Sequence, residues 1–270
     1  MKITFGNKKL LFFMRLPSVR LFGLIGYPLR HSFSQKFFSE KFHREGIEGC
    51  RYDLFPLYKI EELPFLLQLH PHLKGLNVTI PYKEKVLPFL DEIDPEAAQV
   101  GAVNVLKIKD GKLTGYNTDI FGFEKSLLDF LAASGLTLSP AHPLTALILG
   151  TGGASKAVAH VLKKLGIAFQ FASRSKKEGV ITYEELSPEI LAAHRLVVNT
   201  TPLGTFPNVE EYPPLPYDFV NETHLFYDLV YNPEKTSFLK KAEARHARIC
   251  NGLKMLHLQA EKAWEIWNQG

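Results

Sequence analysis

A glycine-rich turn between an apolar strand and a helix limits this chain to few folds. The apolar run Leu144 to Leu149 leads into Gly150-Thr-Gly-Gly-Ala-Ser155, and a helical pattern runs from Ala154 to Leu165. Glycines let a backbone approach a pyrophosphate closely, while free amides and the helix dipole favour its negative charge. The turn therefore predicts a Rossmann-like unit that binds a dinucleotide. Because Ser155 replaces the last glycine of the GxGxxG pattern, a turn that is merely tight is the alternative.

The segment after the next strand indicates which dinucleotide is bound. The strand predicted at Ala168 to Ala172 is followed by Ser173-Arg-Ser-Lys-Lys177. An acidic residue about 20 positions beyond the glycines would hold a ribose 2′-hydroxyl, whereas arginine accommodates a 2′-phosphate. The segment therefore favours NADP over NAD, with a solvated basic turn as the competing interpretation.

The first half of the chain also alternates strands and helices. Leu21 to Ile25, Tyr52 to Phe55 and Gly75 to Ile80 have the apolar pattern of strands. Ser34 to Arg44 and Ile60 to Leu69 have the periodicity of helices. This βαβ order favours a parallel sheet.

A hairpin and a long helix follow. Asp110-Gly111 is a strong hairpin signal because both turn positions favour positive φ, and it separates the strands predicted at 102–108 and 112–116. An amphipathic helix is expected at 119–133, and the proline-containing segment 134–143 is typical of a linker into a second unit.

The second unit repeats the alternation. Further strands are predicted at Leu196 to Asn199 and Leu225 to Leu229, and a last helix at Leu253 to Trp267. Gln259 lies at the edge of the apolar arc of that helix, where a side-chain amide needs polar partners. At 270 residues the chain is long enough for two α/β domains.

Composition excludes several classes of function. The 32 lysines and arginines against 28 acidic residues, without a long run of like charge, suit an anionic small molecule rather than a nucleic acid. Cys50 and Cys250 lie in no metal-ligand or redox spacing, so no metal is expected. No apolar run is long enough to span a membrane, and the patch at Leu10 to Phe13 is too short for a signal peptide. We therefore expect a cytoplasmic protein.

A lysine and a carboxylate offer proton-transfer chemistry. Lys83 follows Pro81 at a predicted strand-to-helix junction, and Asp119 follows Asn117 and Thr118 at a predicted helix start. A lysine needs burial or charged neighbours to exchange protons near neutral pH. On these residues alone, a solvated Lys83 and a helix-capping Asp119 are the favoured interpretations.

Taken together, the ordered motifs resemble those of the shikimate dehydrogenase family, from about Leu21 to Trp267. The matching segments are Gly26-Tyr-Pro-Leu-Arg-His-Ser-Phe-Ser34, Asn77-Val-Thr-Ile-Pro-Tyr-Lys-Glu84, Gly101-Ala-Val-Asn104, Tyr116-Asn-Thr-Asp119, Gly150-Thr-Gly-Gly-Ala-Ser155, Asn199-Thr-Thr-Pro202, Tyr227-Asp-Leu-Val-Tyr231 and Asn251-Gly-Leu-Lys-Met-Leu256. The resemblance implies the reversible NADPH-dependent reduction of 3-dehydroshikimate to shikimate, an oxidoreductase step of chorismate and aromatic amino acid biosynthesis.

The resemblance also implies site residues. Lys83 and Asp119 would be the catalytic pair. The implied substrate contacts are Ser32, Ser34, Thr79, Asn104, Tyr231 and Gln259. The implied cofactor contacts are Gly150, Thr151, Gly152, Gly153, Ala154, Ser155, Ser173, Arg174, Ser175, Lys177, Leu229 and Gly252.

Domain boundaries follow from the motifs. We expect an extension at 1–19, a substrate-binding catalytic domain at 20–118 completed by the C-terminal helix at 253–270, and a Rossmann-like NADP-binding domain at 119–252. The active site would lie in the cleft between the domains. The expected partners are the small-molecule substrate, with no nucleic acid and no membrane, in a monomer or homodimer.

Three positions depart from the family pattern, and two other functions remain open. Gln35 stands where a proline is usual, Ser173 where an asparagine is common, and Thr205 where an apolar residue is common. A quinate or shikimate dehydrogenase using NAD is one alternative, disfavoured by the basic turn at 173–177. A ligand-sensing protein without catalysis is the other, disfavoured by the retained Lys83 and Asp119.

Overall fold

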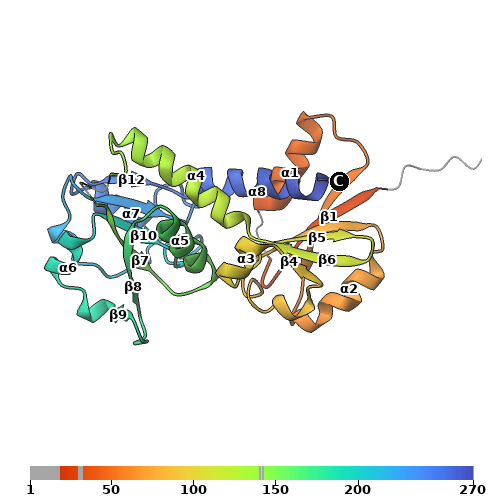
Figure 1. The fold of residues 1–270 in the computed structure, drawn as a ribbon. Coiled ribbons are helices and arrows are strands. Elements are labelled where there is room, and N and C mark those ends of the chain that lie inside the picture. Colours follow the sequence, from red (N-terminus) through yellow and green to blue (C-terminus); the bar gives the residue numbers. More distant parts are fainter. Residues whose placement is uncertain (1–18, 30–32, 140, 142, 270) are drawn as a thin grey trace, which may run out of the picture.

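The computed structural model describes residues 19–29, 33–139, 141 and 143–269. Two sheets, each flanked by helices, lie side by side, and two long helices run between them (Figure 1). Residues 1–18 of the predicted extension at 1–19 lie outside the described residues, and so does Ser32.

The first sheet has the order β2-β1-β3-β5-β6-β4. Its strands are β1 (Arg20–Gly26), β2 (Cys50–Pro56), β3 (Leu73–Val78), β4 (Glu92–Ile93), β5 (Val105–Lys109) and β6 (Lys112–Tyr116). β1 pairs in parallel with β2 and β3, as the alternating pattern predicts, whereas β5 is antiparallel to both β3 and β6. The sheet is therefore mixed, because the tight hairpin joins antiparallel strands.

The hairpin prediction is confirmed in detail. Asp110 and Gly111 have φ values of 51° and 79°, the left-handed conformation that this turn requires. β5 begins only at Val105, whereas the apolar pattern placed its start at Ala102. Asn104 consequently lies just outside the strand.

The second sheet has the order β12-β11-β10-β7-β8-β9, and all its ladders are parallel. Its strands are β7 (Thr145–Leu149), β8 (Ala168–Ser173), β9 (Val180–Thr182), β10 (Leu196–Asn199), β11 (Leu225–Asp228) and β12 (Arg248–Cys250). β7 is at the centre and ends at the glycine-rich turn. In an open parallel sheet, ligands bind beyond the carboxyl ends of such strands.

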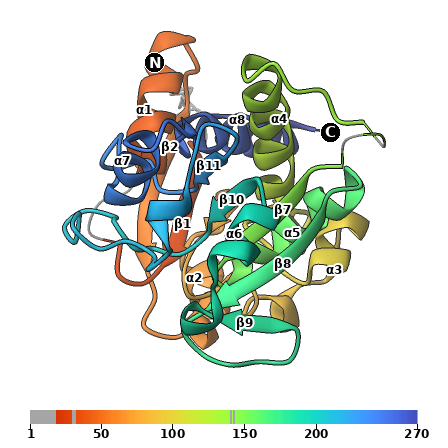
Figure 2. The same cartoon turned by 90° about the vertical axis from the view of Figure 1, so that its left-hand side faces the viewer.

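The helices cover both sheets. They are α1 (Phe33–Arg44), α2 (Leu63–Leu69), α3 (Pro95–Val100), α4 (Thr118–Ala133), α5 (Gly153–Lys164), α6 (Pro188–Ala193), α7 (Ser237–Glu243) and α8 (Leu253–Asn268). Short 3₁₀ turns occur at η1 (Ile60–Glu62), η2 (Leu87–Phe89), η3 (Tyr183–Glu185) and η4 (Tyr217–Phe219). α4 and α5 pack on one face of the second sheet, and α6 and α7 pack on the other (Figure 2).

Helices α4 and α8 connect the two halves of the molecule. Phe123 and Leu127 of α4 are buried in the core of the second sheet. Trp267 of α8 is buried against the first sheet, where its Nε1 donates to the carbonyl of Leu106 at 2.9 Å. The two helices touch at Gly122, where an added Cβ would lie 2.7 Å from the carbonyl oxygen of Met255. The halves are therefore joined by packed helices rather than by a loose linker alone.

Candidate active site

Lys83 lies in a series of turns that follows β3. The predicted strand-to-helix junction is wrong, because these turns lead into the 3₁₀ segment η2 instead of an α-helix. The Lys83 carbonyl accepts a hydrogen bond from the Val103 amide at 2.7 Å. The buried neighbour Tyr82 donates its hydroxyl to the carbonyl of Leu57 at 2.5 Å. These two hydrogen bonds fix the backbone from which the Lys83 side chain extends.

The structure brings Lys83 and Asp119 together. Lys83 Nζ lies 2.5 Å from Asp119 Oδ2, and the two side chains are only 18% and 6% exposed. The other carboxylate oxygen, Asp119 Oδ1, accepts from Asn104 Nδ2 at 2.9 Å. An ion pair shielded from water in this way is stronger than one at an exposed surface. An amine and a carboxylate thus share one proton-transfer site.

Asp119 is not the cap of its helix, although the local sequence favoured that role. The N-cap of α4 is Asn117, whose side-chain oxygen accepts from the Asp119 amide at 3.1 Å. Asn117 Nδ2 also donates to the carbonyl of Ala102 at 2.8 Å. Because Asn117 satisfies the end of the helix, the Asp119 carboxylate is free to face Lys83.

Asn104 links three segments beside this pair. Its Nδ2 lies 3.0 Å from Gln259 Oε1 on α8 and 3.1 Å from Thr118 Oγ1 on α4. Its Oδ1 accepts from the Thr118 amide at 2.7 Å. Two of the predicted substrate residues, Asn104 and Gln259, therefore lie together beside the Lys83–Asp119 pair. Thr118 was not among the predicted site residues, although it lies inside the Tyr116-Asn-Thr-Asp119 motif.

The other predicted substrate residues lie on neighbouring elements. Thr79 directly follows β3, Ser34 lies in the first turn of α1, and both are half-buried. Tyr231, beyond β11, packs its ring against Phe33 of α1 at 5.7 Å between centroids. Burial raises the pKa of the Tyr231 hydroxyl.

One polar pair near these residues was missed by the sequence predictions. The hydroxyl of buried Tyr52 donates to Asn77 Oδ1 at 2.7 Å, and Asn77 lies in β3 two residues before Thr79. Its place in the Asn77-to-Glu84 motif was the available signal. The hydrogen bond holds the Asn77 amide at the carboxyl end of β3.

The glycine-rich turn has the geometry that a pyrophosphate requires. Gly150 has φ of 103°, and an added Cβ there would lie 2.9 Å from Thr200 Oγ1. A Cβ at Gly152 would meet nothing within 4 Å, so the backbone is open on that side. Gly152 is also the N-cap of α5 and provides no side-chain cap for its amides. These residues fit a bound phosphate group at the helix start.

The turn also lies beside Lys83. A Cβ built onto Gly153 would be only 3.4 Å from Lys83 Cβ. Ala154 continues the first turn of α5, whereas the buried Ser155 donates its hydroxyl to the carbonyl of Gly152 at 2.6 Å. Ser155 therefore shapes the turn internally.

The segment 173–177, which is predicted to lie on the adenosine side, is tied to the glycine-rich turn. Lys177 Nζ donates to Thr151 Oγ1 at 2.9 Å. Ser173 Oγ donates to the Ser175 carbonyl at 2.7 Å and accepts from the Ser175 amide at 3.2 Å, which closes a tight loop. Arg174 is exposed and forms no ion pair with a carboxylate of the described ranges. Its guanidinium is available to a phosphate group.

Comparison with known proteins accounts for this arrangement. A family model for the shikimate dehydrogenase substrate binding domain matches residues 24–106. A shikimate dehydrogenase (NADP(+)) of Clostridium beijerinckii is 38% identical over 263 residues, which cover 93% of this chain and 93% of that protein. This chain belongs to the shikimate dehydrogenase family.

Solved structures of shikimate dehydrogenases share the fold over nearly the whole chain. The enzyme from Aquifex aeolicus superposes with a TM-score of 0.80 at 32% identity, covering 93% of this chain and 92% of that one. The Thermus thermophilus enzyme, solved in complex with NADP(H) and shikimate, has a TM-score of 0.77 at 32% identity. That match covers 92% of this chain and 93% of the other.

The residues expected on the nicotinamide side also meet. An added Cβ at Gly252 would lie 2.1 Å from the Leu229 carbonyl oxygen, so only glycine fits there. The Gly252 amide donates to the Val230 carbonyl at 3.1 Å, and the Leu229 amide donates to the Asn199 carbonyl at 2.9 Å. The close contact explains the glycine by packing alone, and its role toward a nicotinamide stays a prediction.

A buried carboxyl that the sequence did not single out organises this side of the site. Asp228, at the end of β11, accepts from Asn199 Nδ2 at 2.9 Å, from the Val230 amide at 3.0 Å and from Thr236 Oγ1 at 2.6 Å. Burial raises the pKa of this carboxyl to about 7 despite these hydrogen bonds.

The raised pKa of Asp228 predicts a pH-dependent stability. The native state holds the carboxyl proton up to about pH 7, whereas an unfolded chain releases it at about pH 4. Wild-type stability should therefore fall between these pH values, by at most about 1.4 kcal/mol per unit. Asp228→Asn removes this titrating group. The difference in unfolding free energy, variant minus wild type, should therefore rise as the pH increases from 5 to about 7. Urea titrations at each pH measure it.

Asp129→Asn is the matched control. That carboxyl is partly exposed on α4, and its hydrogen bond with Lys254 lowers its pKa. Its removal should produce no such rise. An unfolding free energy for Asp228→Asn that runs parallel to wild type across this pH range would show that the Asp228 carboxyl does not titrate there.

Two further observations bear on partners. Within the residues that the structure describes, no three His, Cys, Asp or Glu side chains are grouped so as to hold a metal ion. Over the same residues, no helix has the length and apolar character to cross a membrane.

Proposed function

We propose that this chain is an NADP-dependent shikimate dehydrogenase, which interconverts 3-dehydroshikimate and shikimate in the biosynthesis of chorismate and aromatic amino acids. The observation that carries the proposal is the Lys83–Asp119 pair, with 2.5 Å between Nζ and Oδ2, beside the glycine-rich turn. The family of NADP-dependent enzymes to which the chain belongs supports the cofactor and the substrate.

The residues of the pair have distinct roles in this reaction. Bound NADPH supplies the hydride. The ammonium of Lys83 donates a proton to the oxygen of the substrate carbonyl, and in the reverse direction the amine takes a proton from the hydroxyl. Asp119 holds the ammonium through Oδ2 and is itself fixed by Asn104 through Oδ1. General acid–base catalysis of this kind is typically worth about 10² to 10⁴ in rate.

The same proposal assigns the two halves of the chain. Residues 20–118 with the C-terminal helix would bind the substrate, and 119–252 would bind the cofactor. The packing of α8 on the first sheet supports this division. The roles of Ser32, Ser34, Thr79, Asn104, Tyr231 and Gln259 as substrate contacts belong to the proposal too, as do a cytoplasmic location and a monomeric or homodimeric state.

A cofactor assay tests the proposal. Purified protein with 3-dehydroshikimate should consume NADPH, followed by its absorbance, much faster than NADH. Consumption of NADH at an equal or greater rate would favour the quinate or shikimate dehydrogenase that uses NAD. The absence of turnover with either cofactor, in protein that binds shikimate, would favour a ligand-sensing role.

Arg174→Ala tests the adenosine side. Removing a guanidinium that contacts the 2′-phosphate should raise KM for NADPH by about 10- to 100-fold, the usual range for a charge-assisted hydrogen bond. KM for NADH should stay unchanged because NADH lacks that phosphate. Arg51→Ala, at an exposed ion pair on β2, is the control. Equal NADPH affinities in wild type and Arg174→Ala would remove Arg174 from the cofactor site.

A further inference from the structure

An ion pair joins the two halves of the molecule next to the catalytic lysine. Lys156 Nζ, on the first turns of α5, lies 2.6 Å from Glu84 Oε2. Glu84 directly follows Lys83 in the chain, and Lys156 is three residues beyond Gly153. A Cβ built onto Gly153 would lie 3.4 Å from Lys83 Cβ and 3.9 Å from Glu84 Oε1. The start of α5 thus touches the Lys83 segment at two points.

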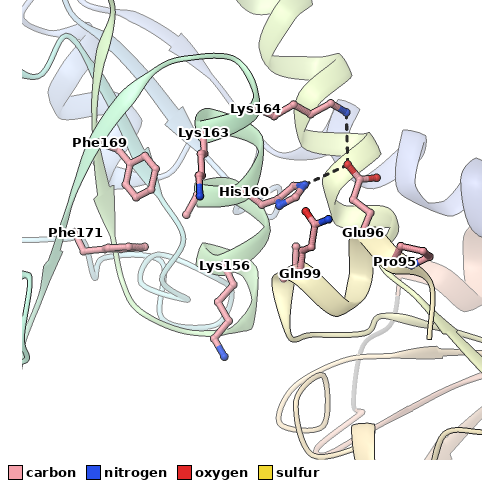
Figure 3. Close-up of a pocket in the computed structure, with 11 residues that line it drawn as sticks. Pro95, Glu96, Gln99, Lys156, His160, Lys163, Lys164, Phe169 and Phe171 are labelled. Carbon is pink, nitrogen blue, oxygen red and sulfur yellow. Dashed lines mark hydrogen bonds and ion pairs between the residues drawn. The ribbon is translucent and has the colours of Figure 1, made fainter. Parts of the chain in front are cut away.

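The same face of α5 makes further polar contacts, two of them with α3 in the first half of the chain. His160 and Lys164 follow Lys156 at intervals of four residues, so all three side chains share one face. His160 Nε2 lies 3.2 Å and Lys164 Nζ 3.5 Å from Glu96 Oε1 on α3 (Figure 3). Lys164 also pairs with Glu124 of α4 at 2.8 Å. In Figure 3, Lys156 extends from the other end of the same helix.

We infer that Glu84 and Lys156 are positioning residues, which hold the phosphate-binding turn in register with Lys83 when the two halves close. The inference rests on the proposed function. Both side chains are partly exposed, at 45% and 40%, and such pairs contribute little to global stability. We infer that the contact biases an equilibrium between closed and open halves, in which a small difference in interaction energy changes the populated fraction several-fold.

Exchanging the charges of Glu84 and Lys156 distinguishes the positioning role of the ion pair from a direct effect of Lys156 on the anionic cofactor. Lys156→Glu and Glu84→Lys each place like charges at the contact and should lower kcat about five- to tenfold. KM for 3-dehydroshikimate should stay within about twofold, because the proposed substrate contacts nearest to Lys83 are unchanged. The double variant Glu84→Lys with Lys156→Glu restores the pair with reversed polarity, and should regain kcat to within about threefold of wild type.

Lys163→Glu is the matched control on the same helix. Lys163 is exposed, and the structure gives it no ion pair with any residue that it describes. Lys163→Glu therefore makes the same change of charge on α5 without disturbing any ion pair among the residues that the structure describes. If Lys156→Glu behaves like Lys163→Glu, or if the double variant is no better than the worse single variant, the inference is wrong.

A second measurement does not depend on catalysis. Small-angle scattering of the five proteins with saturating NADP⁺ should give a larger radius of gyration for each single variant at the contact, and a wild-type value for the exchanged pair and for Lys163→Glu. Equal radii in all five would overturn the inference. Wild-type protein that consumes no NADPH would instead contradict the proposed function, and the scattering would still decide whether the pair holds the halves together.

Discussion

Lys83→Met is expected to lower kcat by about 10² to 10⁴, the usual contribution of a positioned general acid–base. Methionine keeps most of the side-chain volume but has no proton to give. Asp119, only 6% exposed, would lose its cationic partner and keep its hydrogen bond from Asn104. Substrate and cofactor binding should change much less than kcat. Steady-state rates of NADPH oxidation, with binding followed by fluorescence, measure both quantities.

Lys85→Met is the control for this experiment. Lys85 is exposed and lies two residues beyond Lys83 in the same run of turns. Its replacement should leave kcat unchanged. Wild-type turnover in Lys83→Met would remove Lys83 from the mechanism, and an equal loss in Lys85→Met would indicate a general disturbance of the segment.

Asp119→Asn should lower kcat by about 10² or more. The two neighbours of this carboxylate, Lys83 Nζ and Asn104 Nδ2, are both hydrogen-bond donors. The amide side chain of the variant would offer one acceptor oxygen and one NH₂ group. In one of the two contacts its NH₂ group would therefore face another hydrogen-bond donor. The Lys83 ammonium is then no longer held in place. The measurement is kcat together with the thermal unfolding midpoint.

Asp129→Asn provides the comparison on the same helix. Asp129 is a partly exposed carboxylate of α4 that pairs with Lys254 at 2.8 Å. It undergoes the identical chemical change at a distance from the site, so kcat should be retained. A fall in kcat of similar size in both variants would mean that the loss reflects a disturbance of helix α4 rather than of the proposed catalytic pair.

Features with a strong local pattern were predictable from the sequence. The hairpin at Asp110-Gly111 requires two residues that tolerate positive φ, and both adopt it. The glycine-rich turn begins with Gly150, whose φ of 103° excludes other residues. Such signals depend on a few neighbouring residues, so no tertiary contact is needed to interpret them.

Some short elements gave no comparable signal. β9, β12, α6 and α7 are each at most seven residues long, and none is buried along its whole length as the predicted four-residue strands β10 and β11 are. Elements of this length depend on tertiary packing for their stability. In α7, Phe238 and Leu239 are buried in the core beneath the second sheet. The periodicity of so few residues cannot distinguish a helix from a loop.

The site itself is made by long-range contacts. Lys83 and Asp119 are 36 positions apart in the chain, and Asn104 and Gln259 are 155 apart. The local sequence favoured Asp119 as a helix cap, because neighbouring residues carry no information about which distant side chain faces the carboxylate. The resemblance to a family supplied the pairing that local patterns could not. Asp228 was missed in part for the same reason, since one of its partners, Asn199 at the end of β10, is 29 positions away in the chain.

A crystal structure of the protein with NADP⁺ and shikimate bound tests the proposed roles of Lys83 and Asp119 most directly. Lys83 Nζ and the Asp119 carboxylate are expected to stay within hydrogen-bonding distance of each other in that complex. Both should contact one substrate hydroxyl, with the pyrophosphate on the amides of the turn at 150–155. Electron density that places shikimate away from these two side chains, or the two side chains in separate environments, would contradict these roles.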